Sequence, residues 1–442
     1  MDGFVVYLSD DDMDMGQRFD NISTWLNTYE CTRSTTEWIC EGLEIEDYVV
    51  QSHPDVSPAK WHLGHTTWFF EQFILVKFLK NYKCFNEQLH LIFNSYYKSM
   101  GNHWIQGDRG QLSRPTVSEI KHYRQYVNAS INELLTGYLD EKARMEILSL
   151  LELGINHEQQ HQELLLMDIK YNFAVNPFNV SYLTENYPSS YPCSASYLSV
   201  KGGLYQIGQS GIDRFCYDNE TPRHKVHIDS FQIRNSLVTN GEYLEFIKDN
   251  GYNCPDYWYS DAWALIQSQC WQAPLYWFEK EGHWFYKTLY GEQAVDLNEP
   301  VSHISFYEAA AFAKWAKKRL PTEFEWEVAS QELALSVSNN FMEKRKFAPV
   351  LSQIDFTNDN HLISLHGGLW EWMQSSYHAY PGYVAPEGAL GEYNSKFMNG
   401  PMVLRGGCYA TPEQHYRSTY RNFFNADKRW MFSGIRLCKD NT

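Results

Sequence analysis

The sequence predicts an α+β protein with two domains, a helical N-terminal domain followed by a domain of short strands and few helices. Two observations lead to this prediction. Apolar residues recur at helical spacing in four stretches between residues 18 and 171, whereas the chain beyond residue 200 contains short strand-like pieces and many glycines. The length supports the division, since 442 residues are too many for one ordinary compact core.

The N-terminal part contains four stretches with a helical pattern. A domain of four such helices is expected to fold as a four-helix bundle, which we place at residues 1–175. The core of a bundle is a usual place for a metal site built from facing helices. The four stretches are residues 18–49, 57–82, 116–135 and 141–171.

Local signals mark the starts of two of these helices. Ser57 and Pro58 form a favourable start for the second. Thr116 is followed three residues later by Glu119, the signature of a capping box, at the start of the third. Between them, residues 83–115 are rich in Tyr, Asn and Gly and lack a clear period. A long irregular segment inside a compact domain is often an active-site loop.

The pattern changes after the fourth helix. Residues 176–200 contain prolines, serines and tyrosines without a helical period, and we interpret them as a connector. Residues 201–442 are then expected to form the α+β domain. Its clearest predicted strands are "GGLYQIGQS" and "HKVHIDSFQI", and its clearest predicted helices are "NGEYLEFIKDN" and "SFYEAAAFAKWAKKRL".

Composition excludes several classes of partner. The formal net charge is −17, which argues against nucleic acid and against an anionic membrane surface. No stretch approaches the roughly 18 apolar residues of a membrane span, and the first residues do not resemble a signal peptide. The nine cysteines are scattered without a CxxC pair. These features favour a cytoplasmic protein, and they carry no signal for an oligomeric state.

The stretch "GINHEQQHQELLLMDIKY" places two histidines, His157 and His161, four residues apart. On a helix this spacing brings both imidazoles to one face, where they can bind one metal ion. The letters also match the HExxH motif of zinc proteases, in which Glu158 would be the general base. The alternative is a solvated helix face with no ligand. The stretch alone leaves these interpretations open.

A second stretch, "WHLGHTTWFFE", adds His62 and His65 on another predicted helix. Either could be a buried core residue, but a third imidazole from a facing helix would complete a site with open coordination positions. Three neutral imidazoles suit Fe(II), Zn or Cu, and residue content alone does not choose among these metals. A three-nitrogen set with open positions suits non-haem iron that binds both substrate and O₂.

These stretches resemble a known family. "SPAKWHLGHTTWFFE" followed by "GINHEQQHQELLLMDIKY" is similar to the DinB-like bundle of the ergothioneine-biosynthesis sulfoxide synthases. The second half resembles the formylglycine-generating-enzyme (sulfatase-modifying) domain, which has a C-type-lectin-like α+β fold. The resemblance covers nearly the whole chain, and the order of the two domains is specific for this family. In the second half it rests on residues 218–247, 300–327, 367–383 and 403–424.

The resemblance implies a ligand set and a reaction. His65, His157 and His161 would bind Fe(II), and His62 would support them or fill space. The family joins the thiol sulfur of cysteine or γ-glutamylcysteine to C2 of the imidazole of hercynine, with O₂, giving a sulfoxide. Because the third ligand then lies upstream on another helix, the protease interpretation becomes the weakest, and Glu158 has no assigned role.

The resemblance also suggests contacts for hercynine. Gln160 and Asn422 match positions that contact this substrate in the family. The trimethylammonium group of hercynine favours aromatic faces. Candidate rings are Trp370, Trp372, Phe423 and Phe424. Each of these rings could instead be core packing.

The long loop carries further candidates. Tyr96 and Tyr97 stand where one branch of the family has active-site tyrosines, and a phenol can supply a proton during O₂ reduction, which would favour the sulfoxide over a thiol dioxygenation product. Arg109 and Arg114 follow on the same loop, where a guanidinium suits the carboxylate of a cysteine substrate. Loop packing for the tyrosines and structural salt bridges for the arginines are the alternatives.

Departures from related patterns narrow the choice of sulfur donor. The branch that uses γ-glutamylcysteine has an acidic residue just after Asn422, whereas this chain reads "RNFF", which favours free cysteine. Only Cys408 lies near the strand that carries a copper-binding cysteine pair in formylglycine-generating enzymes, so copper chemistry is not expected. Alternatives are a relative that uses a selenium donor or unmethylated histidine (selenoneine- or ovothiol-type), a DinB-type thiol transferase, and a non-enzymatic lectin-like protein.

Overall fold

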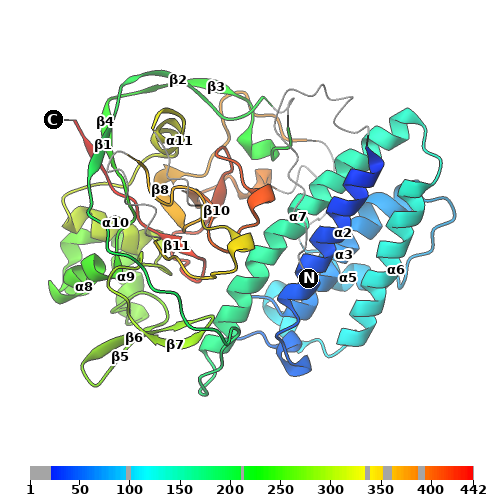
Figure 1. Ribbon diagram of the computed structural model, residues 1–442, viewed down its shortest axis with the longest axis horizontal. Helices are drawn as coiled ribbons and strands as arrows, with labels where there is room; N and C mark the ends of the chain where they lie inside the picture. Colours follow the sequence, from blue (N-terminus) through cyan, green and yellow to red (C-terminus); the bar gives the residue numbers. More distant parts are fainter. Residues whose placement is uncertain are drawn as a thin grey trace.

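The computed structural model describes residues 21–95, 101–210, 214–333, 339–351, 361–386 and 394–441. It contains a helical N-terminal part and a C-terminal part of mixed helices and strands, so the α+β prediction is confirmed (Figure 1). The longest helix, α7, runs along the boundary between the two parts (Figure 1). Among the described residues, no helix is long and apolar enough to cross a membrane.

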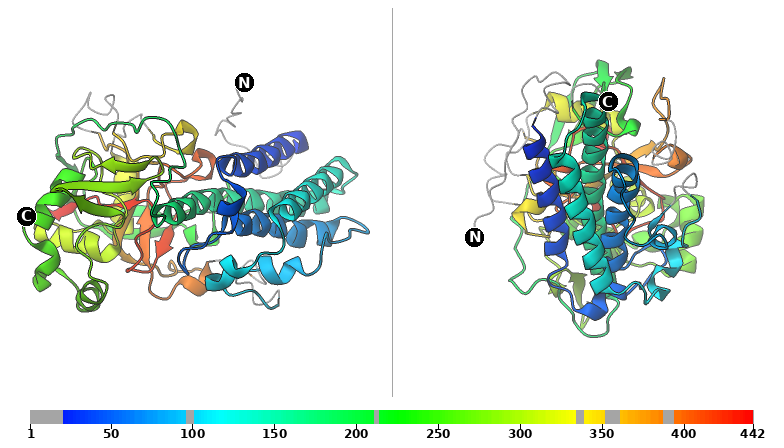
Figure 2. Two further views of the ribbon diagram at one scale, coloured as in Figure 1. Left: turned by 90° about the horizontal axis from the view of Figure 1, so that it is seen from below. Right: turned by 90° about the vertical axis from the view of Figure 1, so that its right-hand side faces the viewer.

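Four long helices lie side by side in the N-terminal part (Figure 2). As predicted, the third begins with a capping box, in which Thr116 and Glu119 bond each other's backbone N–H groups. The helices of this part are α2 (Ile22–Ile39), α3 (Ala59–Phe70), α4 (Val76–Phe78), α5 (Leu89–Phe93), α6 (Val117–Thr136) and α7 (Glu141–Ala174), with a π-helical turn at Glu71–Leu75 and 3₁₀ helices at Ile45–Val49 and Gln106–Gln111.

Helix α3 starts directly after Ser57 and Pro58, as the sequence predicts. The helix begins at Ala59, Pro58 takes the N-cap position, and no side chain caps it. Ser57 contacts other parts of the bundle instead: its hydroxyl accepts from Arg109 (2.8 Å), and its backbone N–H donates to Asp168 of α7 (2.7 Å). Long-range partners therefore replace the local cap at this position.

The C-terminal part consists of small sheets and short helices. Its helices are α8 (Asn240–Lys248), α9 (Ser260–Ser268), α10 (Phe306–Trp315) and α11 (Glu323–Glu332), with 3₁₀ turns at Asp218–Glu220, Gly251–Asn253, Pro255–Tyr257, Met342–Lys344, Ser395–Phe397 and Glu413–His415. Its strands are β1 (Tyr197–Val200), β2 (Gly203–Ile207), β3 (His224–Ile228), β4 (Phe231–Arg234), β5 (Trp277–Lys280), β6 (His283–Thr288), β7 (Gly291–Ala294), β8 (Trp370–Ser376), β9 (Met402–Arg405), β10 (Asn422–Phe424), β11 (Ser433–Gly434) and β12 (Cys438–Asp440).

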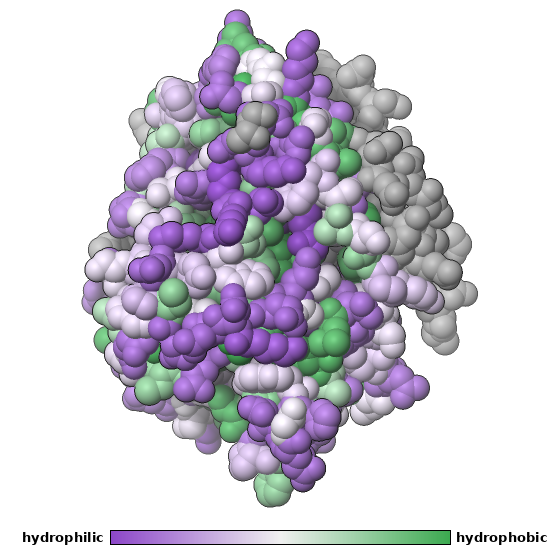
Figure 3. Space-filling view, turned by 90° about the vertical axis from the view of Figure 1, so that its left-hand side faces the viewer, coloured by the Kyte–Doolittle hydropathy of each residue, from purple (hydrophilic) through white to green (hydrophobic). Residues whose placement is uncertain are grey.

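The strands pair in four sheets. Their orders are β1-β4-β12, β10-β9-β8-β11, β2-β3 and β5-β6-β7. Strand β9 pairs antiparallel with both β8 and β10, whereas β11 pairs parallel with β8. The predicted connector is partly structured, since β1 lies inside residues 176–200 and pairs with β4. Figure 3 shows the end of the molecule formed by this part, where polar side chains predominate and apolar ones form scattered patches.

Buried ion pairs stabilise the small sheets. Arg436 contacts Glu371 of β8 at 2.7 Å, and Arg405 of β9 contacts Glu327 of α11 at 2.6 Å, all fully buried. Each pair joins elements that are far apart in sequence. Because a buried charge without its partner is costly, these pairs fix how the short elements assemble.

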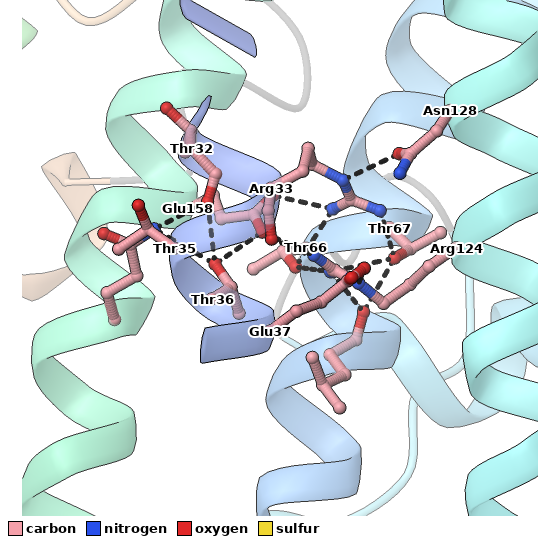
Figure 4. A network of polar contacts seen from close by, with 12 residues as sticks. Thr32, Arg33, Thr35, Thr36, Glu37, Thr66, Thr67, Arg124, Asn128 and Glu158 are labelled. Atoms are coloured by element: carbon pink, nitrogen blue, oxygen red, sulfur yellow. Dashed lines mark hydrogen bonds and ion pairs between the residues drawn. The ribbon is translucent and has the colours of Figure 1, made fainter. Parts of the chain in front are cut away.

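The bundle has a buried ionic network of its own (Figure 4). Glu158 of α7, which is 0% exposed, accepts from Arg33 of α2 (2.6 Å), Arg124 of α6 (3.0 Å) and Thr36 of α2 (2.7 Å). Arg33 also donates to Thr67 of α3 (2.8 Å). The network thus joins all four long helices. Burial alone would raise the pKa of Glu158, but the two guanidinium groups hold it below its ordinary value.

This arrangement predicts a large effect of removing one carboxylate. Glu158→Ala leaves two guanidinium groups buried without their shared anion, and we expect it to lower the free energy of unfolding by about 3–5 kcal/mol. The matched control is Glu146→Ala on the same helix, where an exposed ion pair with Lys77 predicts a loss below about 1 kcal/mol. Urea unfolding followed by circular dichroism measures both, and equal losses would contradict the prediction.

Candidate metal centre

Three buried histidines converge between α3 and α7. His65 comes from α3, His157 and His161 from α7, and each offers a ring nitrogen within 4.8 Å of the other two. The Nε2 atoms of His65 and His157 are 3.1 Å apart. His65, His157 and His161 are 1%, 1% and 8% exposed, respectively. Within the described part of the chain this is the only group of three or more His, Cys, Asp or Glu side chains that could hold a metal ion.

Close helix packing brings these residues together. His157 and His161 are one turn apart on α7 and therefore share a face. Two glycines remove bulk nearby: a Cβ at Gly64 would lie 2.2 Å from the Phe93 ring, and a Cβ at Gly154 would lie 2.4 Å from the Phe70 ring. Gly64 is the residue just before His65. It lets α5 approach α3 so closely that the Phe93 carbonyl reaches the His65 ring.

Hydrogen bonds orient two of the rings. The Nδ1–H of His65 donates to the Phe93 carbonyl (2.6 Å), which leaves Nε2 as the nitrogen with a lone pair. Nδ1 of His161 lies 2.9 Å from Nδ1 of His62, whose Nε2 lies 3.0 Å from a carboxylate oxygen of Asp168. His62, which the sequence left between support and packing, therefore contacts one of the three converging histidines directly.

The electrostatics fit a divalent metal. Burial lowers the pKa of His157 to about 3, and burial together with the neighbouring histidines holds the pKa values of His65 and His161 well below the usual range. All three are therefore neutral at pH 7, which is the protonation state that binds metal. Three neutral nitrogens converging on one point, two of them with their second nitrogen already bonded, fit Fe(II), Zn or Cu by ligand type.

Glu158, the general base of the protease interpretation, points elsewhere. Its carboxylate is held by Arg33 and Arg124 within the four-helix network, although it follows His157 directly in sequence. A carboxylate with two guanidinium partners and no exposure is not placed to accept a proton from a substrate or water. The structure thus gives this residue a role in helix packing.

One of the two loop arginines lies near the centre. The Trp61 ring stacks on His65, with centroids 4.5 Å apart and an interplanar angle of 11°. The Arg109 guanidinium lies 3.3 Å from the centroid of the Trp61 ring and makes a cation–π contact with it. Arg109 is buried, whereas Arg114 is exposed. Both line a cavity of about 10 Å³ next to Trp61 and Phe93. A positive charge therefore lies one ring away from His65.

A different face of α7 contacts the C-terminal part. Gln160, next to His161 in sequence, donates its side-chain amide to the Tyr420 hydroxyl (3.0 Å). Glu163 accepts from the indole of Trp370 (2.6 Å). His415 lies 3.1 Å from the side-chain oxygen of Asn156 and makes an edge contact with Tyr420. The C-terminal part thus contributes a buried tyrosine and a buried histidine beside the centre.

Sequence reasoning missed three of these residues. Asp168 follows His161 by seven residues, which is two helical turns, so a carboxylate on the same face was detectable from spacing. Tyr420 stands two residues before Asn422, inside the stretch that carried the resemblance. No local pattern distinguishes His415, because its position depends on how the two parts pack together.

Comparison with known proteins agrees with both parts. A sulfatase-modifying factor enzyme 1-like domain matches residues 186–441, and the DinB superfamily matches residues 28–165. Hercynine oxygenase of Mycolicibacterium smegmatis is 32% identical over 315 residues, which cover 65% of this chain and 71% of that protein. Hercynine oxygenase of Mycobacterium tuberculosis is 31% identical over 306 residues, covering 65% and 70%. The chain belongs to the hercynine oxygenase family.

Membership of the hercynine oxygenase family makes this chain an oxygenase and confirms the resemblance in its sequence. A fungal relative, ergothioneine biosynthesis protein 1 of Schizosaccharomyces pombe, is 27% identical over 261 residues, covering 56% of this chain and 31% of that protein. The non-enzymatic, lectin-like alternative does not agree with these matches.

The remaining predicted substrate contacts lie in different places. Trp372 is buried, and its indole donates to the Ile304 carbonyl (2.9 Å). Phe423 stacks on Tyr377, Phe424 packs on Trp430, and the Asn422 side chain accepts from the Phe423 backbone. Within the described residues, no hydrogen bond or ring contact joins these four predicted contacts to the three histidines. Tyr96 and Tyr97 lie outside the described residues.

The Gly64 contact yields a prediction whose sign is informative. In a helix, Gly→Ala normally stabilises by about 0.5–1 kcal/mol. Here the new methyl group would collide with Phe93, so we expect Gly64→Ala to destabilise by about 1–3 kcal/mol and to weaken metal binding by displacing the partner of His65. Gly107→Ala, which meets only ordinary contact at 3.4 Å, is the control. A melting temperature of the Gly64→Ala variant above that of the wild type would refute the inference of close packing at this position.

Proposed function

We propose that this protein is an Fe(II)- and O₂-dependent sulfoxide synthase of ergothioneine biosynthesis, which joins the sulfur of cysteine to C2 of the imidazole of hercynine. The observation that carries the proposal is the buried trio His65, His157 and His161, placed at the junction with the second domain. Membership of the hercynine oxygenase family supports the choice of substrate.

The proposed reaction balances without a further reductant. One C–H bond of the imidazole and one S–H bond of the thiol are broken, and a C–S bond forms. One oxygen atom of O₂ becomes the sulfoxide oxygen, and the other leaves as water with the two hydrogen atoms. The two substrates together supply the four electrons that O₂ accepts. When bound, Fe(II) would supply the O₂ chemistry and a template on which both substrates meet.

The residues of the chain have separate proposed tasks. The three histidines would hold the metal, and the Phe93 carbonyl and His62 would keep their rings oriented. Trp61 excludes water from one side of the centre, since its ring covers His65. Removing water strengthens every charge interaction in the site.

Charge and aromatic groups would position the substrates. Arg109 can attract the carboxylate of cysteine, and Arg114 can assist from the rim of the small cavity. Gln160 and Asn422 are the proposed contacts for hercynine. For the trimethylammonium group we retain the aromatic candidates Trp372, Phe423 and Phe424. Trp370 is a further candidate, because its indole contacts Glu163 of α7.

Free cysteine is the proposed sulfur donor, because Phe423 and Phe424 follow Asn422 where an acidic residue would favour γ-glutamylcysteine. A DinB-type thiol transferase would need only the bundle, so the match of the second domain over residues 186–441 favours the synthase. The same iron site could serve a selenium donor or unmethylated histidine, so both compounds are tested as substrates.

The test is anaerobic reconstitution with Fe(II), followed under air by hercynine with cysteine, with γ-glutamylcysteine or with a selenium donor, and by histidine with cysteine, with product masses recorded. We expect the coupled sulfoxide, formed faster from cysteine. His161→Ala should lose both iron retention and O₂ uptake, whereas the exposed His53→Ala should keep both. A coupled product that forms only from a selenium donor or from histidine would refute the proposed substrates. Full activity in His161→Ala would refute the ligand set.

The proton-donor role proposed for Tyr96 or Tyr97 has its own measurement. Replacing the responsible phenol by Phe should shift the product from the coupled sulfoxide toward cysteine sulfinate, because the thiol is then oxidised without coupling. Tyr126→Phe, on the exposed surface of α6, is the matched control. An unchanged product ratio in both single variants and in the double variant would reject the hypothesis.

A further inference from the structure

His62 lies between a proposed ligand and a buried carboxylate. Its Nδ1 is 2.9 Å from Nδ1 of His161, and its Nε2 is 3.0 Å from a carboxylate oxygen of Asp168. The rings of His62 and His161 meet edge to face, with centroids 5.2 Å apart. His62 and Asp168 are 2% and 4% exposed, so bulk water does not compete for these bonds.

The protons in the series of hydrogen bonds from Asp168 through His62 to His161 can be assigned starting from Asp168. Asp168 already accepts the backbone N–H of Ser57 (2.7 Å), and as an acceptor it also takes the Nε2–H of His62. A neutral His62 then has its lone pair on Nδ1. Only one proton fits between the two facing Nδ1 atoms, and it must belong to His161. His161 is left with its lone pair on Nε2.

The location of Asp168 favours this assignment. Its carboxylate lies at the N-terminal end of α3, where it accepts from the backbone N–H of Ser57, two residues before the helix. The backbone dipoles of a helix stabilise negative charge at this end. His62 occupies the first turn of the same helix, and His65 lies one turn later on the same face. The first two turns of α3 therefore carry His62 and the proposed ligand His65, and the carboxylate of Asp168 from α7 lies at the start of the same helix.

We propose that His62 and Asp168 are positioning residues that lock His161 in the tautomer with Nε2 available to the metal and increase the electron density of its ring. The proposal rests on the proposed function, since it assigns a task toward Fe(II) at the same centre. His65 provides a comparison, since it donates to a neutral carbonyl, whereas His161 connects through His62 to a carboxylate. Partners of this kind raise the basicity of a ligating imidazole.

Two substitutions separate the parts of this proposal. Asp168→Asn keeps the size and a hydrogen-bond acceptor but removes the charge, and His62→Phe keeps a ring of similar shape without nitrogen atoms. His53→Phe, at an exposed histidine, is the matched control. Circular dichroism and thermal melting establish which variants fold. His62→Gln is a second replacement that keeps a polar side chain, in case the Phe variant does not fold.

The first readout is the dissociation constant for Fe(II), measured anaerobically by competition with a chromogenic chelator. We expect 10–100-fold weaker binding in His62→Phe and Asp168→Asn, the usual consequence of removing such a partner, and no change in His53→Phe. The second readout is the reduction potential of the bound iron. It should rise in Asp168→Asn, because the ring of His161 then donates less electron density, and a purely structural role would leave it unchanged.

The possible results distinguish this proposal from the proposed function. A wild-type protein that binds no Fe(II) refutes the iron centre itself. A wild-type protein that binds Fe(II), with folded His62 and Asp168 variants that match its dissociation constant and its reduction potential, refutes the positioning role alone. Weaker Fe(II) binding with an unchanged reduction potential in Asp168→Asn would support the role in orienting His161 and refute the effect on the electron density of its ring.

Discussion

The burial of α7 on two polar faces is the constraint on which the rest of the structure depends. One face presents His157 and His161 to α3, and another presents Gln160, Glu163 and Lys170 to the second domain. A buried polar group without a partner costs about 1–3 kcal/mol. The second domain therefore has one favourable position against the bundle, in which each of these groups is satisfied, and that position places it beside the centre.

The interior of the bundle separates charge from the proposed ligands. Glu158 and its two arginines lie on one side of α7 and tie the four long helices together, while the three histidines on the neighbouring face remain neutral. Because Glu158 follows His157 directly, the ion network and the centre hold the same turn of α7 on two neighbouring faces. The spacing between α3 and α7 is thus fixed before any metal binds, which lowers the cost of organising the site.

Sequence periodicity predicted what depends on one helix at a time. The capping box at Thr116 and the shared face of His157 and His161 follow from local helix geometry. The order of the two domains was predicted from their motifs. What depends on packing was not accessible. Trp370 and Trp372 share one face of β8 and look equivalent in sequence, yet the first donates to Glu163 of α7 and the second to a carbonyl inside the C-terminal domain. Only the docking of β8 against α7 distinguishes them.

The neutrality of the three histidines has a consequence for the substrates. A divalent ion bound by three imidazoles keeps its full charge, and Arg109 adds a further positive charge one ring away. Among the described residues, Asp168 is the carboxylate that reaches this ligand set, and it does so through His62. Under the proposed function, the thiolate and the carboxylate of the proposed cysteine substrate would supply negative charge beside the ion.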